Sequence, residues 1–217
     1  MEKFAEGWKI QKDFCQEPLT WNINITGDQF LESFKKCGYT LTKNLTVLEI
    51  GAGIGRILDS FKKEFDFKKW ILVEINPTRA QLLKKKFEND NRVVVLNENI
   101  IKCKFLDLDD KFDFVISSLT FKHFFPDFTQ VLTHLNPYLN DTSIVVFDIR
   151  MGDKDHLLLK NNSMMNVFTP RSMNYLIEAS GYLIEKIGTV IYPVGERKLY
   201  CIKKVGLESN YIRNSLG

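Results

Sequence analysis

The sequence lacks a strong excess of charge of either sign. Its 217 residues contain 30 Lys and Arg against 27 Asp and Glu, which leaves a formal net charge of +3. Domains devoted to nucleic acid are usually more basic and gather their cations on one face. The lysine run at 84–86 is more typical of a solvated helix face than of a binding patch. The charge balance therefore argues against nucleic acid as a partner.

Cysteine and histidine are scarce and widely spaced. The four cysteines, at positions 15, 37, 103 and 201, form no Cys-x-x-Cys pair, and there are 3 histidines. Zinc sites and disulfide frameworks need closely spaced residues of these types. Scattered single cysteines are typical of reduced core residues in a cytosolic protein. We expect no metal ion and a cytoplasmic location.

Long hydrophobic runs are also missing. A transmembrane helix needs about 18 or more apolar residues in succession, and no such stretch occurs. The first residues, MEKFAEGWKIQKDF, contain no apolar run of the length that a signal peptide needs. We therefore expect no association with a membrane. We also expect either a monomer or a homodimer.

Short apolar runs that alternate with amphipathic stretches are the main pattern present. The runs at 45–50, 70–75, 92–97, 112–118 and 143–149 predict five strands, and the stretches at 54–65, 77–89 and 128–139 predict the helices between them. Nearly continuous apolar strands that alternate with helices indicate a parallel sheet covered on both faces. The 17 Phe residues predict an aromatic core.

The last third of the chain has a different pattern. Thr169 and Pro170 predict the start of a helix that ends at Gly181. Segments 182–192 and 196–205 then predict two antiparallel strands joined by a short turn. Residues 1–44 contain one predicted helix, at 27–39. With no linker or repeat in between, we expect one domain over 1–217, with a core at 45–205 behind an N-terminal cap or lid at 1–44.

A glycine-rich turn carries most of the functional information. The segment EIGAGIGR (49–56) joins the first predicted strand to the first predicted helix. Glycines at such a turn let the backbone approach a ligand closely. A dinucleotide site would have glycine where this chain has Arg56. Moreover, the carboxylate of Glu49 would repel a pyrophosphate but suits a ligand with an amino or sulfonium cation.

This turn resembles motif I of the class I S-adenosylmethionine-dependent methyltransferases, E/D-x-G-x-G-x-G. Glu74 stands 19 residues after Gly55 at the end of the second predicted strand, where an acid can accept hydrogen bonds from the ribose hydroxyls. The resemblance extends over about residues 40–205. It implies a Rossmann-like α/β fold with a seven-stranded sheet in the order 3-2-1-4-5-7-6, the seventh strand antiparallel and helices on both faces. It also implies S-adenosylmethionine as cofactor and S-adenosylhomocysteine as product.

The resemblance also implies which residues hold the cofactor. In the family's segment after the third strand, Asn99 takes the place of an acid that contacts the adenine amino group, and its side-chain carbonyl can still accept that hydrogen bond. The side chain of Trp21 belongs either to a lid over the cofactor or to the core. The cofactor-binding residues that we expect are Glu49, Gly51, Ala52, Gly53, Gly55, Glu74, Ile75, Asn99, Ile100, Ser117, Ser118 and Trp21.

His123 is the candidate general base for the methyl transfer. It follows the fourth predicted strand, and ligands of open α/β sheets bind beyond the carboxyl ends of the strands. A histidine titrates in the range that suits such a role. The alternative is a histidine that only lines the site or caps the next helix. Asp148 and Arg150, at the end of the fifth predicted strand, could hold a substrate or pair with each other.

Absent motifs narrow the methyl acceptor. The fourth strand ends in SSLT (117–120) rather than in the Asn/Asp-Pro-Pro-Tyr of enzymes that methylate base amines, and no cysteine stands in a Pro-Cys or Thr-Cys context. Serines also stand where metal-dependent catechol enzymes carry acids. We therefore expect methyl transfer to an oxygen or nitrogen of a small molecule or a peptide-like natural product. The alternatives are a protein or RNA methyltransferase, a non-catalytic methyltransferase-like partner subunit, or, against the evidence of Arg56, an NAD-dependent oxidoreductase.

Overall fold

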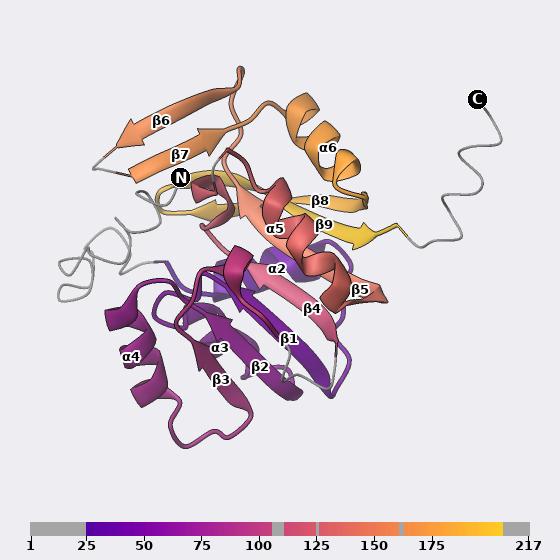
Figure 1. The fold of residues 1–217 in the computed structure, drawn as a ribbon. Helices are drawn as coiled ribbons and strands as arrows, with labels where there is room; N and C mark the ends of the chain where they lie inside the picture. The colour runs from indigo at the N-terminus through magenta and orange to yellow at the C-terminus, as the bar shows by residue number, and fades with distance from the viewer. Residues whose placement is uncertain (1–24, 106–110, 125, 161–162, 206–217) are drawn as a thin grey trace.

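The computed structural model describes residues 25–105, 111–124, 126–160 and 163–205. Within these residues the main sheet has the strand order β3-β2-β1-β4-β5-β9-β8 (Figure 1). Its strands are β1 (Leu45–Ile50), β2 (Phe67–Val73), β3 (Val93–Leu96), β4 (Phe112–Ser117), β5 (Leu139–Ile149), β8 (Tyr182–Tyr192) and β9 (Gly195–Lys204). The strands from β3 to β5 pair in parallel, whereas β9 is antiparallel to both β5 and β8. Counted within this sheet alone, the order is 3-2-1-4-5-7-6, so the predicted fold is confirmed.

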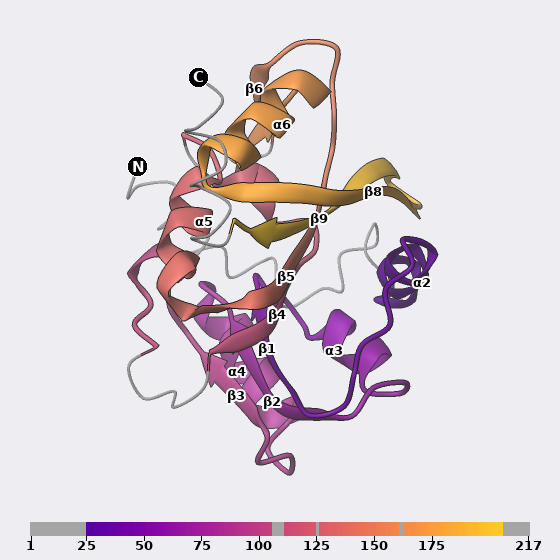
Figure 2. The ribbon, with the colours of Figure 1, turned by 90° about the vertical axis from the view of Figure 1, so that its right-hand side faces the viewer.

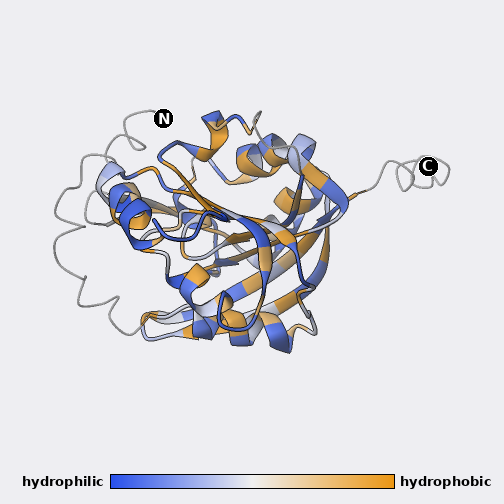
Figure 3. Cartoon of the chain, turned by 90° about the horizontal axis from the view of Figure 1, so that it is seen from below, coloured by the Kyte–Doolittle hydropathy of each residue, from blue (hydrophilic) through white to orange (hydrophobic). Residues whose placement is uncertain are grey.

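Helices cover both faces of the sheet. Figure 2 shows α2 (Asp28–Lys36) and α3 (Arg56–Phe61) on one face, and α5 (Thr129–Leu135) and α6 (Pro170–Ala179) on the other. The helix α4 (Pro77–Lys86) follows β2, and its N-terminus is capped by the side chain of Asn76, which accepts a hydrogen bond from the Arg79 N–H. In Figure 3 the helices carry both hydrophobic and hydrophilic residues, as amphipathic helices do.

Each face of the sheet has an aromatic core, as the phenylalanine content predicts. On the face of α2 and α3, Phe61 packs edge-on against Trp70 with ring centroids 5.9 Å apart. On the face of α5 and α6, the rings of Phe121 and Phe147 stack at 4.1 Å, with Phe128 beside both. All five of these side chains are fully buried. The sheet is therefore held rigidly between two apolar layers.

Several predicted boundaries are wrong, and backbone chemistry explains the largest shifts. The helix predicted at 54–65 begins only at Arg56, because Gly55 has a left-handed backbone with φ of 78° at the N-cap. The helix predicted at 128–139 ends at Leu135 and continues as the 3-10 helix Asn136–Tyr138, since Pro137 lacks the N–H group that would continue the α-helical hydrogen bonds. The strand β5 then starts at Leu139, four residues before its predicted start.

A second, two-stranded sheet lies in a segment where the sequence analysis placed no element. The strands β6 (His156–Lys160) and β7 (Ser163–Val167) pair antiparallel between β5 and α6. The side-chain amide of Asn166 donates hydrogen bonds to the carbonyl oxygens of Phe124 and Pro126. This hairpin is therefore fastened to the loop that follows β4. None of the helices in the described ranges is long and apolar enough to cross a membrane.

Candidate active site

The glycine turn is fastened to the neighbouring strand by its own backbone. The N–H groups of Gly51 and Ala52 both donate to the carbonyl oxygen of Val73, at 2.8 and 3.2 Å. Gly51 has φ of 71°, and a Cβ atom built there would lie 2.3 Å from Thr120 Oγ1. A side chain at position 51 would therefore suffer both backbone strain and steric overlap. This position requires glycine in order to pack the loops after β1 and β4 together.

Gly53, at the centre of the turn, faces open space. Its φ is 61°, and a Cβ atom built there would meet no heavy atom within 4 Å. The Gly53 N–H donates to Glu74 Oε2 at 2.8 Å, so that an open backbone surface lies directly beside a carboxylate. A glycine in this setting leaves room for a ligand to approach the main chain.

Glu74 joins the end of β2 to the turn and to the next helix. Its Oε1 accepts a hydrogen bond from the Asn76 N–H at 2.8 Å, while Oε2 accepts from Gly53. Its side chain is buried, and burial raises the pKa of the carboxyl group against the opposing effect of these N–H donors. The Asn97 amide donates to the carbonyl oxygens of Glu74 and Ile75, which fixes the strand end from the other side.

These groups fit the ribose of an adenosyl cofactor. An ionised carboxylate has about four lone-pair sites, and two backbone donors leave the others available to sugar hydroxyls. The open side of Gly53 supplies the space next to them. The turn and Glu74, 21 positions apart, are thus brought together as predicted.

The two residues predicted to contact adenine lie in the loop after β3. Asn99 caps the 3-10 helix Ile100–Lys102 with its Oδ1 atom, which accepts a hydrogen bond from the Ile101 N–H at 3.2 Å. Ile100 is buried in the core, and Ile75 is half-buried at the end of β2. The Asn99 oxygen keeps a second lone pair. An adenine contact at these residues stays a prediction.

Glu49 has a different environment from the one that its place in the motif suggests. Its carboxyl group is buried, and Oε2 accepts a hydrogen bond from Trp70 Nε1 at 3.1 Å, across the β1–β2 pair. Burial raises the pKa of Glu49 to about 8, although the Trp70 hydrogen bond opposes the shift. The hydrogen bond described for this side chain leads to β2 and not to the glycine turn. Its predicted contact with a cationic amino group remains untested.

The two serines at the end of β4 have separate partners. Ser117 Oγ donates to the Ile50 carbonyl oxygen at 2.9 Å, so it ties β4 to β1. Ser118 Oγ donates to Asp148 Oδ2 at 2.7 Å and accepts a hydrogen bond from Arg56 Nη2 at 2.7 Å. The Ser117 hydroxyl is therefore bound to a main-chain carbonyl, whereas the Ser118 hydroxyl belongs to a buried network of side chains.

We call this network the Asp148 cluster; it consists of Arg56, Ser118, Asp148, Tyr192 and Arg197. The Tyr192 hydroxyl donates to Asp148 Oδ2 at 2.9 Å, and Arg197 Nε lies 3.9 Å from Asp148 Oδ1. Burial, and then the charge of Asp148, raise the pKa of Tyr192. The cluster joins α3 to the ends of β4, β5 and β8 and to the start of β9.

Sequence reasoning missed two members of this cluster and the partner of a third. It left open whether Asp148 pairs with Arg150, but the ion pair that the structure gives Asp148 is with Arg197, and Arg150 is exposed. A signal for Arg197 was present, since it shares its strand face with the buried Leu199 and Cys201. No local pattern pointed to Tyr192.

His123 lies at the carboxyl end of β4, as predicted, in the short 3-10 helix Phe121–His123. Its backbone N–H donates to the Thr120 carbonyl oxygen at 2.9 Å, and the residue is half-buried. Its neighbour Lys122 is half-buried as well, and burial, followed by repulsion from Arg197, lowers the pKa of that amine to about 8. A role for His123 as a base stays a prediction.

The aromatic residues that follow β4 differ in their burial. Phe121 and Phe128 are fully buried core residues, whereas Phe124 is half-buried. Trp21 and Phe125 lie outside the described residues, so the predicted lid role of Trp21 is not tested.

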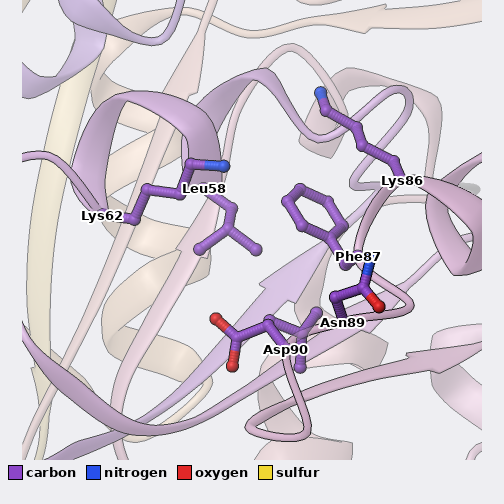
Figure 4. A pocket seen from close by; sticks show the side chains of 7 residues that line it. Leu58, Lys62, Lys86, Phe87, Asn89 and Asp90 are labelled. Atoms are coloured by element: carbon purple, nitrogen blue, oxygen red, sulfur yellow. The ribbon is translucent and has the colours of Figure 1, made fainter.

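A cavity of about 200 Å³ lies between α3, α4 and β3 (Figure 4). The ammonium groups of Lys62 and Lys86 lie 5.1 and 5.3 Å from the ring centroid of Phe87, which lines the cavity. Lys86 also pairs with Asp59 on α3, so this end of the lysine run is occupied by contacts within the chain. None of the predicted site residues lines this cavity.

Known proteins resemble this chain over the segment that forms the carboxyl edge of the sheet, that is, the edge at which the parallel strands β1 to β5 end. Residues 48–145 match the family described as methyltransferase domain. This segment begins within β1 and ends within β5, so it contains the glycine turn, Glu74 and His123. The predicted resemblance to the class I S-adenosylmethionine-dependent methyltransferases is confirmed.

Solved structures of methyltransferases share the fold at low sequence identity. A methyltransferase of Leishmania major, described as S-adenosylmethionine-dependent, has a TM-score of 0.72 at 17% identity, over 93% of this chain and 82% of that one. The 1,6-didemethyltoxoflavin N1-methyltransferase of Burkholderia thailandensis, solved with bound 1,6-didemethyltoxoflavin and S-adenosylhomocysteine, has a TM-score of 0.68 at 15% identity, over 94% of this chain and 85% of that one. A glycopeptide N-methyltransferase has a TM-score of 0.64 at 11% identity, over 82% and 90%. No curated protein matches the sequence.

Proposed function

We propose that this protein transfers a methyl group from S-adenosylmethionine to an oxygen or nitrogen atom of a small molecule or a peptide-like natural product. The observation that carries the proposal is the Glu74 carboxylate beside the open backbone of Gly53, within a methyltransferase domain. Two proteins that share the fold, the toxoflavin-type and glycopeptide enzymes, act on acceptors of this kind. We also propose that residues 1–217 form one domain, with its core at 45–205.

The residues that follow the carboxyl ends of β1, β2 and β3 would hold the cofactor. Glu74 would accept the ribose hydroxyls, Gly53 would lie against the adenosyl group, and Asn99 would accept from the adenine amino group. The bound cofactor supplies an electrophilic methyl group on a sulfonium centre. The chain's own contribution is then to fix the acceptor in line with that group and to exclude water, which is how an enzyme lowers the barrier of a displacement reaction.

His123 would remove the proton of an acceptor hydroxyl or amine. It is half-buried beyond the carboxyl end of β4, where ligands of open α/β sheets bind, and the short helix that carries it contacts β7. A neutral imidazole is suited to this step near neutral pH. An acceptor that carries no dissociable proton would leave His123 in a purely spatial role.

Calorimetric titration with S-adenosylmethionine, S-adenosylhomocysteine and NAD tests the proposal. We expect micromolar binding of both adenosyl ligands and none of NAD. Glu74→Ala should weaken the adenosyl ligands by about 100-fold, because it removes a charged acceptor and leaves the Gly53 and Asn76 N–H groups without it. The matched control is Glu88→Ala, an exposed acid beyond α4, which should bind normally.

A panel of acceptors then separates the remaining alternatives. Turnover of small hydroxyl or amine compounds, abolished or slowed in His123→Ala, supports the proposal. Tight cofactor binding with turnover only on a protein or RNA would show that the methyl acceptor belongs to that class of substrate. Tight binding with no turnover on any class would indicate a non-catalytic partner subunit. Preference for NAD would refute the methyltransferase reaction altogether.

A further inference from the structure

The Asp148 cluster has more cationic groups than its acid can neutralise. Arg197 is buried, yet its Nε and Nη1 atoms make no hydrogen bond to any residue in the described part of the chain. The nearest acid, Asp148, lies 3.9 Å from Nε, and its oxygens already accept from Ser118, Tyr192 and the Leu119 N–H. A buried guanidinium without hydrogen-bond acceptors is costly unless a partner arrives.

Other cations surround the same point. Arg56 donates to Ser118 within the cluster, and Lys122 and Arg150 lie near enough that their charges act on Arg197 or on each other. Among the described residues of the cluster, one acid, Asp148, faces these four cations. Burial lowers the pKa of Arg197, and Arg150 and Arg56 lower it further, while Asp148 opposes the change. The local potential is therefore positive.

We propose that the Asp148 cluster is the subsite for a carboxylate group of the methyl acceptor. This inference rests on the proposed function and names the chemical class of its substrate, a carboxylic acid that also carries the hydroxyl or amine to be methylated. Arg197 would receive the carboxylate, with Lys122, which precedes His123, and Arg150, which directly follows β5, as further cations.

Carboxylate chemistry fits the groups present. The guanidinium of arginine is planar and presents paired N–H donors that match the two oxygens of a carboxylate. An ionised acid would satisfy the buried donors of Arg197 and reduce the repulsion between the cations. A neutral amide of the same shape would offer one acceptor atom and no charge, so the site should discriminate strongly between the two.

The position of the cluster points to the acceptor rather than to the adenosyl end of the cofactor. Glu74 ends β2 and Asp148 lies near the end of β5, and β1 and β4 stand between these strands. Three strand spacings separate them by roughly 14 Å. His123 follows β4, between the two. An acceptor held at the Asp148 cluster would therefore lie on the opposite side of the transfer position from the ribose.

The first experiment is calorimetry on the full chain saturated with S-adenosylhomocysteine, so that no turnover occurs. The probes are 4-hydroxybenzoate and 4-aminobenzoate, each compared with its neutral amide. We expect each acid to bind at least about tenfold more tightly than its amide. Arg197→Gln should abolish that preference, and Lys122→Gln, at a half-buried position outside the apolar core, should reduce it severalfold. Arg171→Gln, which removes an exposed arginine at the start of α6, is the matched control and should retain it.

Three results would overturn the inference. One is equal binding, or no binding, of acids and amides by the wild-type protein. Another is an acid preference that survives in both Arg197→Gln and Lys122→Gln. The third is a large loss of S-adenosylhomocysteine affinity in Arg197→Gln with unchanged affinity for 5′-methylthioadenosine, which lacks the amino acid arm, since this would assign the subsite to the cofactor's own carboxylate. Failure of the wild type to bind S-adenosylhomocysteine refutes the proposed function instead, so the two failures are distinguishable.

Discussion

The two ends of the carboxyl edge both bury an acid, but they surround it with different groups. Glu74, at the β2 end, accepts hydrogen bonds from two backbone N–H groups, those of Gly53 and Asn76. Asp148, at the β5 end, accepts from the hydroxyls of Ser118 and Tyr192, and faces Arg197. The first acid is held mainly by main chain and the second mainly by side chains from distant segments.

This difference assigns different tasks to the two ends. Backbone donors carry no net charge and stay in place when a ligand binds, so the Glu74 end suits a cofactor that is the same in every turnover. Side chains vary between proteins of one fold more readily than the course of the backbone does, so the Asp148 end suits an acceptor that differs between relatives. Under the proposed function, the excess of positive charge at the second end would favour an acceptor that carries a carboxylate.

Removal of Asp148 should give the largest loss of stability. Asp148→Ala leaves Arg197 buried without its counter-ion and removes the acceptor of Ser118 and Tyr192. We expect the free energy of unfolding, measured with urea, to fall by about 3–5 kcal/mol. The control Asp141→Ala changes an exposed acid of the same strand and should shift stability by about 0.5 kcal/mol or less. Equal effects of the two substitutions would show that the network contributes little to folding.

The pH dependence of stability tests the raised pKa of the buried Glu49. Burial raises the pKa of Glu49 to about 8 in the folded chain. Because this pKa lies above the unfolded value, the protonated group's contribution is complete below about pH 4.5 and is lost as the pH rises toward 8. Glu49→Gln should therefore match the wild type near pH 5 and exceed it by about 3 kcal/mol near pH 8. Urea unfolding at both pH values measures this, with the exposed Glu88→Gln as control. A pH-independent difference would contradict the shift.

The comparison also explains how much of the site the sequence could predict. The glycine turn and Glu74 were predicted because their conformation depends on neighbours within a few positions, and because the strand ends that carry them follow from the apolar pattern. The strand order was implied by the resemblance and confirmed by the structure. By contrast, Arg197 and Asp148 meet only after β9 inserts antiparallel beside β5, and spacing along the chain does not reveal that contact.

Two other differences have local causes that sequence patterns describe poorly. The hairpin β6–β7 lies between β5 and α6 in the chain, and its hydrogen bonds to the loop after β4 are made by Asn166, a residue depleted in strands. Glu49 matches the motif, but its side chain contacts Trp70 on the next strand, since a long acid near the end of a strand can turn toward either neighbour. A motif therefore predicts the course of the backbone more reliably than the direction of a side chain.

The two glycines of the turn provide the finest test of the difference between structural and binding positions. Gly51→Ala should cost about 2–3 kcal/mol of stability, since it combines left-handed strain with overlap on Thr120. Gly53→Ala should cost only about 1 kcal/mol, from strain alone, because its side faces open space. The effects on S-adenosylhomocysteine affinity should be larger at Gly53, where the added methyl group enters the space proposed for the ligand. In a Thr120→Ala background, Gly51→Ala should be less harmful because the two closest contacts, to Oγ1 and Cγ2, are gone. Equal stability losses at the two glycines, or normal ligand binding by Gly53→Ala, would show that the open side of Gly53 is not where the cofactor lies.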